Sequence, residues 1–137
     1  MRIMAVDYGD ARTGIAVSDL TATICGEALT IEEHDMRNAA RRIALTAAEK
    51  NVSRIVLGLP LNMDGTEGPR AEKSREFAKL LTDESGLEVL FRDERKTTVD
   101  AHRILSENGK RMKKHKKNVD AVAAALILES YLREPKR

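Results

Sequence analysis

Residues 2–18 of this 137-residue chain read RIMAVDYGDARTGIAVS, and this stretch decides how the rest of the sequence is interpreted. Its first half is an apolar run that predicts a strand over residues 2–7, ending at Asp7. A turn-rich segment follows, and residues 13–18 alternate between apolar and polar, which predicts a second strand. A weaker third strand is expected at residues 23–31. Because the turns are short, we expect an antiparallel three-stranded ribbon.

The pattern after this ribbon alternates between helices and strands. Apolar spacing, turn residues and caps predict buried strands at residues 54–58 and 87–91, and helices at 35–50, 69–82, 97–109 and 118–133. Strands joined by helices run parallel, with right-handed crossovers. We therefore expect a single α/β domain over residues 1–137, with a mixed five-stranded sheet and helices on both faces.

The composition excludes several classes of protein. The chain has one cysteine, Cys25, so it contains no internal disulfide, and its three histidines are not spaced as zinc-finger ligands. The longest apolar run, residues 121–128, is too short to span a membrane, and the N-terminus does not resemble a signal peptide. We therefore expect a soluble protein of the cytoplasm that has no membrane partner.

Positive charge is concentrated in one short segment. The net charge is +2, but six cations and no acid lie within residues 110–117. The rest of the chain holds 18 cations and 22 acids, so it is mildly acidic. Such a basic run is suited to contacting a phosphate backbone, although a solvated lysine-rich turn explains it equally well.

Acidic residues from distant parts of the sequence are expected at one edge of the sheet. Asp7 ends the first strand, Asp93 and Glu94 follow the last strand, and Asp120 lies in the first turn of the last helix. Helix N-termini gather at the carboxyl ends of parallel strands, where open α/β sheets bind ligands. Each acid taken alone has a structural explanation, such as a turn residue, a solvated side chain or a helix-dipole partner.

The proximity of these acids predicts a metal site. Two carboxylates about 5 Å apart repel each other by roughly 3 kcal/mol at an effective dielectric near 20. A cation among them removes this cost, and hard oxygen ligands suit Mg²⁺ or Mn²⁺. Residues 119–128 are apolar almost all round, which predicts a buried helix that holds Asp120 over the strand ends.

Two other binding modes fit the sequence poorly. The segment between Gly9 and Gly14 has the glycine spacing of a P-loop, but Ile15 and Ala16 replace the required lysine and hydroxyl residue. The chain has only four aromatic residues, so shape or backbone recognition of nucleic acid is favoured over base stacking.

Four sequence blocks resemble the YqgF family, which is also called RuvX. They are DYGDARTGIAVSD at residues 7–19, GLPLNMDGTEG at 58–68, DERKTT at 93–98 and DAVAAALIL at 120–128. Their order matches the family and they span nearly the whole chain. Lys96 departs from the family pattern, which usually has an apolar residue there, and this change should affect local packing more than the acids.

The resemblance implies an RNase H-like fold and a metal-dependent nuclease. By this resemblance, the substrate is the 5′ end of pre-16S rRNA during ribosome biogenesis, or a four-way DNA junction. The expected mechanism is two-metal hydrolysis, in which Asp7 bridges two ions and Glu94 and Asp120 complete their shells. Asp93 competes with Glu94 as a ligand, and the resemblance selects Glu94.

Residues near these acids are candidates for holding the substrate. Arg12 and Arg95 would neutralise phosphates or pair with the acids, and the sequence favours neither role. Thr97 starts a predicted helix, where it would cap the helix or help to hold a phosphate. Residues 62–68 would form a flap or simple turns. The lysines of the basic run precede Asp120 and would contact the backbone: Lys113, Lys114, Lys116 and Lys117.

Other functions remain open at this point. RNase H-like folds also host ATPases and inactive members, so a nucleotide-binding protein or a non-catalytic RNA-binding module is an alternative. The sequence does not choose between RNA and branched DNA. Cutting a four-way junction requires paired cuts and therefore a homodimer, for which the sequence identifies no surface.

Overall fold

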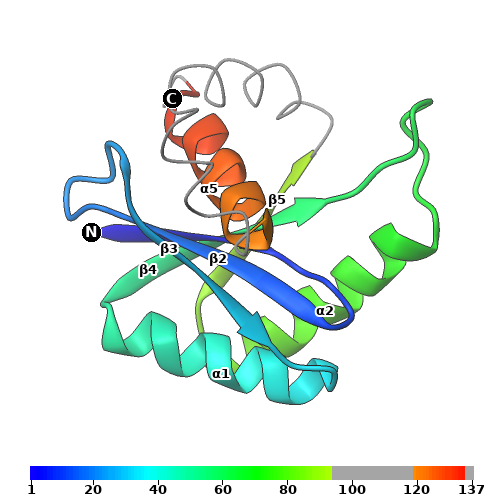
Figure 1. Ribbon diagram of the computed structural model, residues 1–137, viewed down its shortest axis with the longest axis horizontal. Coiled ribbons are helices and arrows are strands. Elements are labelled where there is room, and N and C mark those ends of the chain that lie inside the picture. The colour runs from blue at the N-terminus through cyan, green and yellow to red at the C-terminus, as the bar shows by residue number, and fades with distance from the viewer. Residues whose placement is uncertain (94–118, 135–137) are drawn as a thin grey trace.

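The computed structural model describes residues 1–93 and 119–134, with only the backbone described at residues 119 and 120 (Figure 1). Five strands and three helices make up this part of the chain. In chain order they are β1 (Arg2–Asp7), β2 (Arg12–Ser18), β3 (Cys25–Glu32), α1 (Met36–Glu49), β4 (Val52–Leu59), α2 (Pro69–Ser85), β5 (Glu88–Asp93) and α5 (Val119–Leu132). The helix predicted at residues 97–109 lies outside the described residues.

The strands form one mixed sheet in the order β3-β2-β1-β4-β5. The first three strands are antiparallel neighbours, which confirms the predicted ribbon. Strands β1, β4 and β5 are parallel. The strand β1 therefore lies at the centre, and its carboxyl end lies beside those of β4 and β5.

Two apolar cores lie on opposite faces of the sheet because side chains alternate along each strand. On β1, Met4 and Val6 pack with α1 and α2, whereas Ile3 and Ala5 pack with α5. Figure 1 shows α5 on one side of the sheet and α1 and α2 on the other. The predicted arrangement, a five-stranded sheet with helices on both faces, is confirmed.

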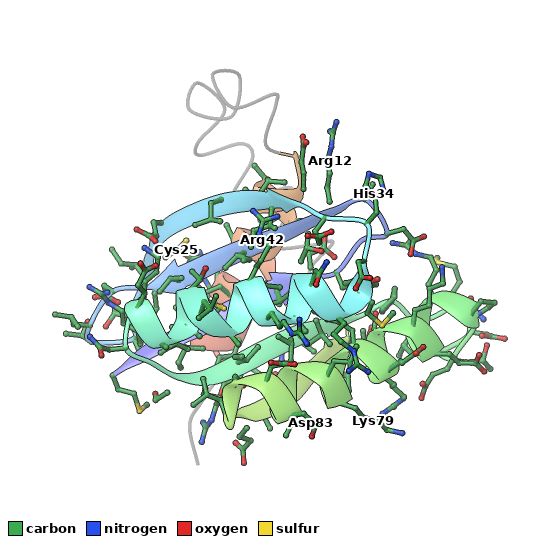
Figure 2. All side chains as sticks on the ribbon, turned by 90° about the horizontal axis from the view of Figure 1, so that it is seen from below. Arg12, Cys25, His34, Arg42, Lys79 and Asp83 are labelled. Carbon is green, nitrogen blue, oxygen red and sulfur yellow. The ribbon has the colours of Figure 1, made fainter. Side chains whose placement is uncertain are left out.

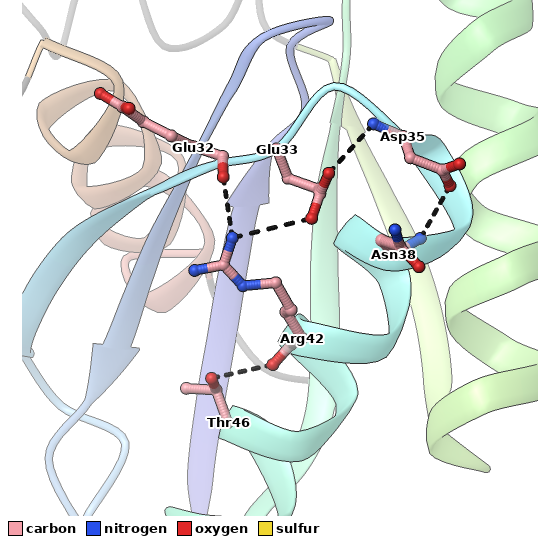
Figure 3. A network of polar contacts seen from close by, with 6 residues as sticks. All are labelled: Glu32, Glu33, Asp35, Asn38, Arg42 and Thr46. Carbon is pink, nitrogen blue, oxygen red and sulfur yellow. Dashed lines mark hydrogen bonds and ion pairs between the residues drawn. The ribbon is translucent and has the colours of Figure 1, made fainter.

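The start of α1 is fixed by a network of polar contacts with the end of β3 (Figure 3). The Asp35 carboxylate caps the helix by accepting a hydrogen bond from the Asn38 backbone N–H at 3.0 Å. One turn further on, Arg42 Nη1 donates to the Glu32 carbonyl at 2.8 Å and pairs with Glu33. These contacts set the position of α1 across the sheet.

Several predicted element boundaries differ from the structure by one to three residues, and the differences in α2, β4 and β5 are the largest near the site. Helix α2 begins at Pro69 as predicted but continues to Ser85, three residues further, and ends where Gly86 adopts φ of 70°. Strand β4 begins earlier, at Val52. Strand β5 continues to Asp93, because its polar last residues still pair with β4. Asp93 is thus the last residue of a strand and does not follow it, as the sequence had suggested.

No helix in the described ranges is long and apolar enough to cross a membrane.

Candidate functional site

Asp7 is the last residue of the central strand and is half-buried. Ile3 and Ala5 of the same strand pack with α5, so the alternation of side chains assigns Asp7 to the α5 face of the sheet. Tyr8 turns to the opposite face and stacks on Phe77 of α2, with 4.3 Å between ring centroids. Burial, followed by the charges of nearby carboxylates, raises the pKa of Tyr8.

Glycines flank Asp7 in the neighbouring strands. Gly14 of β2 is its register partner. In β4, the last residue paired with β1 is Leu57, opposite Val6, and Gly58 is the next residue of that strand. Gly14 therefore places no side chain beside Asp7 in its row of the sheet. Glycine inside a strand often marks a close approach by a ligand or another backbone. This role was not predicted from the sequence, although both glycines fall within predicted strands.

Helix α5 runs antiparallel to β1. Near its C-terminal end, Glu129 Oε1 accepts a hydrogen bond from the backbone N–H of Cys25, the first residue of β3, at 3.0 Å. Arg54, near the start of β4, donates from Nη1 to the Tyr131 hydroxyl at 3.1 Å. Both contacts hold the end of α5 close to where the parallel strands begin.

The beginning of α5 consequently points toward the edge that carries Asp7. From Tyr131 back to Asp120 an α-helix rises about 16 Å. From Ile3, which pairs with Arg54, to Asp7 a strand extends about 13 Å. The backbone of Asp120, in the first turn of α5, therefore lies at about the level of Asp7, on the same face of the sheet.

Asp93 belongs to the other face of the sheet. Val89 of the same strand packs with the α1–α2 core, and the Arg75 guanidinium of α2 lies over the Phe91 ring, 4.9 Å from its centroid. Asp93 is two residues beyond Phe91, so alternation assigns it to the α2 face, opposite Asp7.

Arg12 is the first residue of β2. It lies four residues before Ala16, which packs with α5, so alternation along the strand assigns Arg12 to the same face of the sheet as Asp7. Its recorded ion pair is with Glu32 of β3, at 3.8 Å, and both side chains are mostly exposed. Figure 2 shows Arg12 close to His34 and far from Cys25, which marks the other end of β3. An exposed pair of this kind exchanges readily for a phosphate.

The remaining predicted site residues lie outside the described part of the chain. They are Glu94, Arg95, Thr97, Lys113, Lys114, Lys116 and Lys117, together with the side chain of Asp120. Within the described residues, no three His, Cys, Asp or Glu side chains gather as a metal-binding group. Because two of the three predicted ligands are outside that set, the predicted metal site stays a prediction.

The segment after β4, predicted as a flap or as turns, is a hydrogen-bonded turn. Asn62 N donates to the Thr66 carbonyl at 2.8 Å, and Gly65 N donates to the Asn62 carbonyl at 2.9 Å. Gly65 has φ of 89°, a conformation that favours glycine. Arg75 of α2 binds both carboxylate oxygens of Glu67, at 2.5 and 2.8 Å. The turn is thus tied to α2.

The sheet order and the helix crossing it are those of an RNase H-like fold. Among solved structures, the fold resembles RuvC of Thermus thermophilus, with a TM-score of 0.62 and 11% identity over 97% of this chain and 96% of that chain. It also resembles the Fowlpox virus resolvase in complex with Holliday junction DNA, with a TM-score of 0.60 and 18% identity over 96% and 97%. At these identities the likeness concerns the fold alone.

Sequence comparison then identifies the family. The family model described as "RuvX: Holliday junction resolvase" matches residues 1–134, and the chain belongs to this family. A relative from Ruminiclostridium cellulolyticum, named "Putative pre-16S rRNA nuclease", is 41% identical over 96% of this chain and 94% of its own length. A relative of the same name from Pediococcus pentosaceus is 45% identical over 96% and 92%. These relationships support a hydrolase that cuts nucleic acid.

Proposed function

We propose that this protein is a metal-dependent endonuclease that hydrolyses phosphodiester bonds in the 5′-end processing of pre-16S rRNA. The observation that carries the proposal is Asp7, at the end of the central strand, between two glycines, on the face crossed by α5. The family match and the names of the curated relatives support the same activity. An enzyme that acts on precursor rRNA would work in the cytoplasm, where ribosomes are assembled.

The proposed metal ligands are Asp7, Glu94 and Asp120. Asp7 fits a hard cation such as Mg²⁺ or Mn²⁺, because it is a half-buried carboxylate at the carboxyl end of the central parallel strand. Two bound ions would supply an activated water and stabilise the departing 3′ oxygen. Glu94 is preferred to Asp93 because the resemblance selects it and because Asp93 belongs to the α2 face of the sheet, opposite Asp7.

The chain's own groups would bind and orient the substrate. The backbone at Gly14 and Gly58 lets a phosphodiester approach Asp7 closely. The start of α5 adds the positive end of a helix dipole at the same edge. Arg12 would leave Glu32 to neutralise a phosphate, and Arg95, Thr97 and the basic run would extend the contact along the strand.

A second candidate function is resolution of Holliday junctions. The family description names this activity, and the Fowlpox virus enzyme that shares the fold is seen with such DNA. Two cuts related by two-fold symmetry would require a homodimer. Light scattering and cleavage of a four-way junction test this candidate alongside the first.

The test of the proposed site is a series of single substitutions: Asp7→Asn, Glu94→Gln and Asp120→Asn. Each removes one charge at nearly constant shape, and we expect each to slow cleavage of a pre-16S rRNA fragment by at least about 100-fold, since a metal contributes several kcal/mol to the transition state. Removal of the metal with EDTA should abolish cleavage, and Mn²⁺ should restore it.

The matched control is Asp83→Asn, an exposed carboxylate on α2 (Figure 2). It should leave cleavage and the thermal unfolding midpoint unchanged. Cleavage that persists in all three single variants of the site would falsify the proposal. Cutting of a four-way junction with no cutting of the rRNA fragment would favour the second candidate instead.

A further inference from the structure

A pocket of about 160 Å³ lies at the same edge of the sheet as Asp7, but on the α2 side. The turn after β1 supplies Tyr8, Gly9 and Asp10, and the first turns of α2 supply Arg70, Lys73 and Ser74. Ligand sites for whole cofactors measure about 300–1,000 Å³, so this pocket is too small for a nucleoside triphosphate and suits a phosphate group.

The start of α2 supplies unpaired donors to this pocket. Gly68 occupies the N-cap position and makes no side-chain capping bond, and Pro69 has no N–H. The first amide with a helical partner is that of Glu72, which donates to the Gly68 carbonyl at 3.1 Å. Within the described residues, the N–H groups of Arg70 and Ala71 have no recorded acceptor. A helix N-terminus in this state binds anions.

Ser74 gives an independent indication of a ligand. Its side chain is 3% exposed, yet it lines the pocket and makes no hydrogen bond to any residue that the structure describes. Other hydroxyls of α2 do find partners, since Thr82 donates to the Ala78 carbonyl and Ser85 donates to the Leu81 carbonyl. The Ser74 hydroxyl is therefore available to donate a hydrogen bond to an anion in the pocket.

The charges around the pocket favour an anion. Among the described residues that line it, Arg70 and Lys73 are cations and Asp10 is the one acid. Lys73 Nζ pairs with Asp10 Oδ1 at 3.1 Å, and both side chains are more than half exposed. An exposed pair is weak and lets Lys73 turn to a phosphate that enters the pocket.

We infer that this pocket binds a phosphate of the same nucleic-acid strand whose cleavage is proposed at Asp7. The inference rests on the proposed function. Asp7 and Tyr8 are consecutive residues that lie on opposite faces of the sheet edge, so a strand that crosses this edge would contact both places. The pocket would fix the position of the strand relative to the point of cleavage.

The first test compares two double variants of equal charge. Arg70→Gln with Lys73→Gln removes the pocket cations, whereas Arg37→Gln with Lys79→Gln removes exposed cations from α1 and from further along α2. Binding of a pre-16S rRNA fragment is measured by fluorescence anisotropy in EDTA, with Asp7→Asn in every protein. We expect the pocket variant to bind the RNA about tenfold more weakly. The slope of log affinity against log salt concentration should fall by about 0.7, which is the value for one phosphate of a single strand. Equal losses in both double variants would overturn the inference.

The second test locates the phosphate. A series of oligonucleotides carries one uncharged methylphosphonate at each position in turn. In the parent protein one position near the cut should weaken binding, and the penalty should vanish in the pocket variant. A penalty of the same size in both proteins would overturn the inference. The parent protein and the pocket variant are also compared for binding of an oligonucleotide with a 5′-terminal phosphate and of inorganic phosphate. If the two proteins differ only in binding one of these, the assignment to an internal phosphate of the strand is overturned.

Two single substitutions separate binding from folding. Ser74→Ala should weaken binding about threefold while the thermal midpoint stays level, because the substitution removes a hydroxyl that has no hydrogen-bond partner among the described residues. A lower midpoint with unchanged binding would show a packing role and count against the inference. Asp10→Asn should tighten binding, since it releases Lys73. All these readouts are of binding in the absence of cleavage, so they are independent of the outcome at Asp7, Glu94 and Asp120.

Discussion

At the scale of single residues, the geometry around Asp7 depends on the turn that follows it. A Cβ atom added to Gly9 would lie 2.2 Å from the Arg12 carbonyl oxygen, which is a backbone atom and cannot swing away. Thr13 is fully buried, and its hydroxyl accepts a hydrogen bond from the Gly9 N–H and donates one to the Gly9 carbonyl, each at 3.4 Å. The turn is thus closed too tightly for any side chain at position 9.

Gly9→Ala should therefore destabilise the protein by about 1–3 kcal/mol, the usual cost of forcing extra atoms into a packed site. Cleavage should fall further than the loss of folded protein explains, because Asp7 and Arg12 flank the displaced turn. Gly26→Ala is the matched control, since its added Cβ would have no neighbour closer than 3.4 Å. Urea unfolding and cleavage assays check both effects. Equal stability of the two variants would contradict this account.

The sequence was sufficient to predict some site residues and insufficient for others. Asp7 could be identified because it ends an apolar run, which is a local signal. The role of Gly14 and Gly58 could not, because it depends on the register between strands, which distant residues determine. The sequence pattern did not distinguish Asp93 from Glu94, and the resemblance selected Glu94. Strand β5 ends two residues later than predicted, which places Asp93 in the strand and not in the loop.

At the scale of elements, α5 is the helix on which the proposed site depends most. Ala124 is fully buried against the sheet, in the core that contains Ala5 and Ala16. Small side chains on both surfaces let the helix lie close to the strands. The position of the first turn of α5, and of Asp120 in it, depends on this contact.

Ala124→Leu should push α5 away from the sheet. We expect a loss of about 1–3 kcal/mol in unfolding free energy and a larger proportional loss of cleavage, because the start of the helix moves relative to Asp7. Ala48→Leu, at an exposed position of α1, makes the same change on the other side of the sheet and should affect neither property. Full activity of a destabilised Ala124→Leu protein would show that the placement of α5 does not matter for catalysis.

Element boundaries were less predictable than element order. The order followed from the alternation of apolar strands with helical spacing, which involves many residues at once. The end of α2 was set three residues too early, although Gly86 was available as a stop signal. Strand β5 was predicted too short because Arg92 and Asp93 are polar. Arg92 nevertheless belongs to the strand, where its guanidinium donates to the Ser130 hydroxyl of α5 at 2.6 Å.

At the scale of the whole molecule, the distribution of charge should control substrate affinity. The six cations within residues 110–117 account for a quarter of all Lys and Arg in the chain. Their placement lies outside the described residues, so this expectation rests on the sequence. Contacts with a phosphate backbone are independent of base sequence and sensitive to salt.

Replacing Lys113, Lys114 and Lys116 with Gln should weaken binding to all RNA sequences alike. The slope of log affinity against log salt should flatten by up to about 2, since each neutralised phosphate of a single strand contributes about 0.7. Arg37, Lys79 and Arg133, all exposed, provide a control of equal charge. Affinity measured for several sequences across a salt series checks the expectation, and a loss confined to one sequence would contradict it.

The separation of the two cores has a consequence for the newly made chain. During synthesis, β1, β2 and the helices α1 and α2 can bury the first core as soon as they leave the ribosome. The opposite surface, which includes Ile3, Ala5 and Ala16, stays exposed to water until α5 has been translated. The edge of the sheet that carries Asp7 therefore lacks the first turn of α5 until this last helix packs onto the sheet.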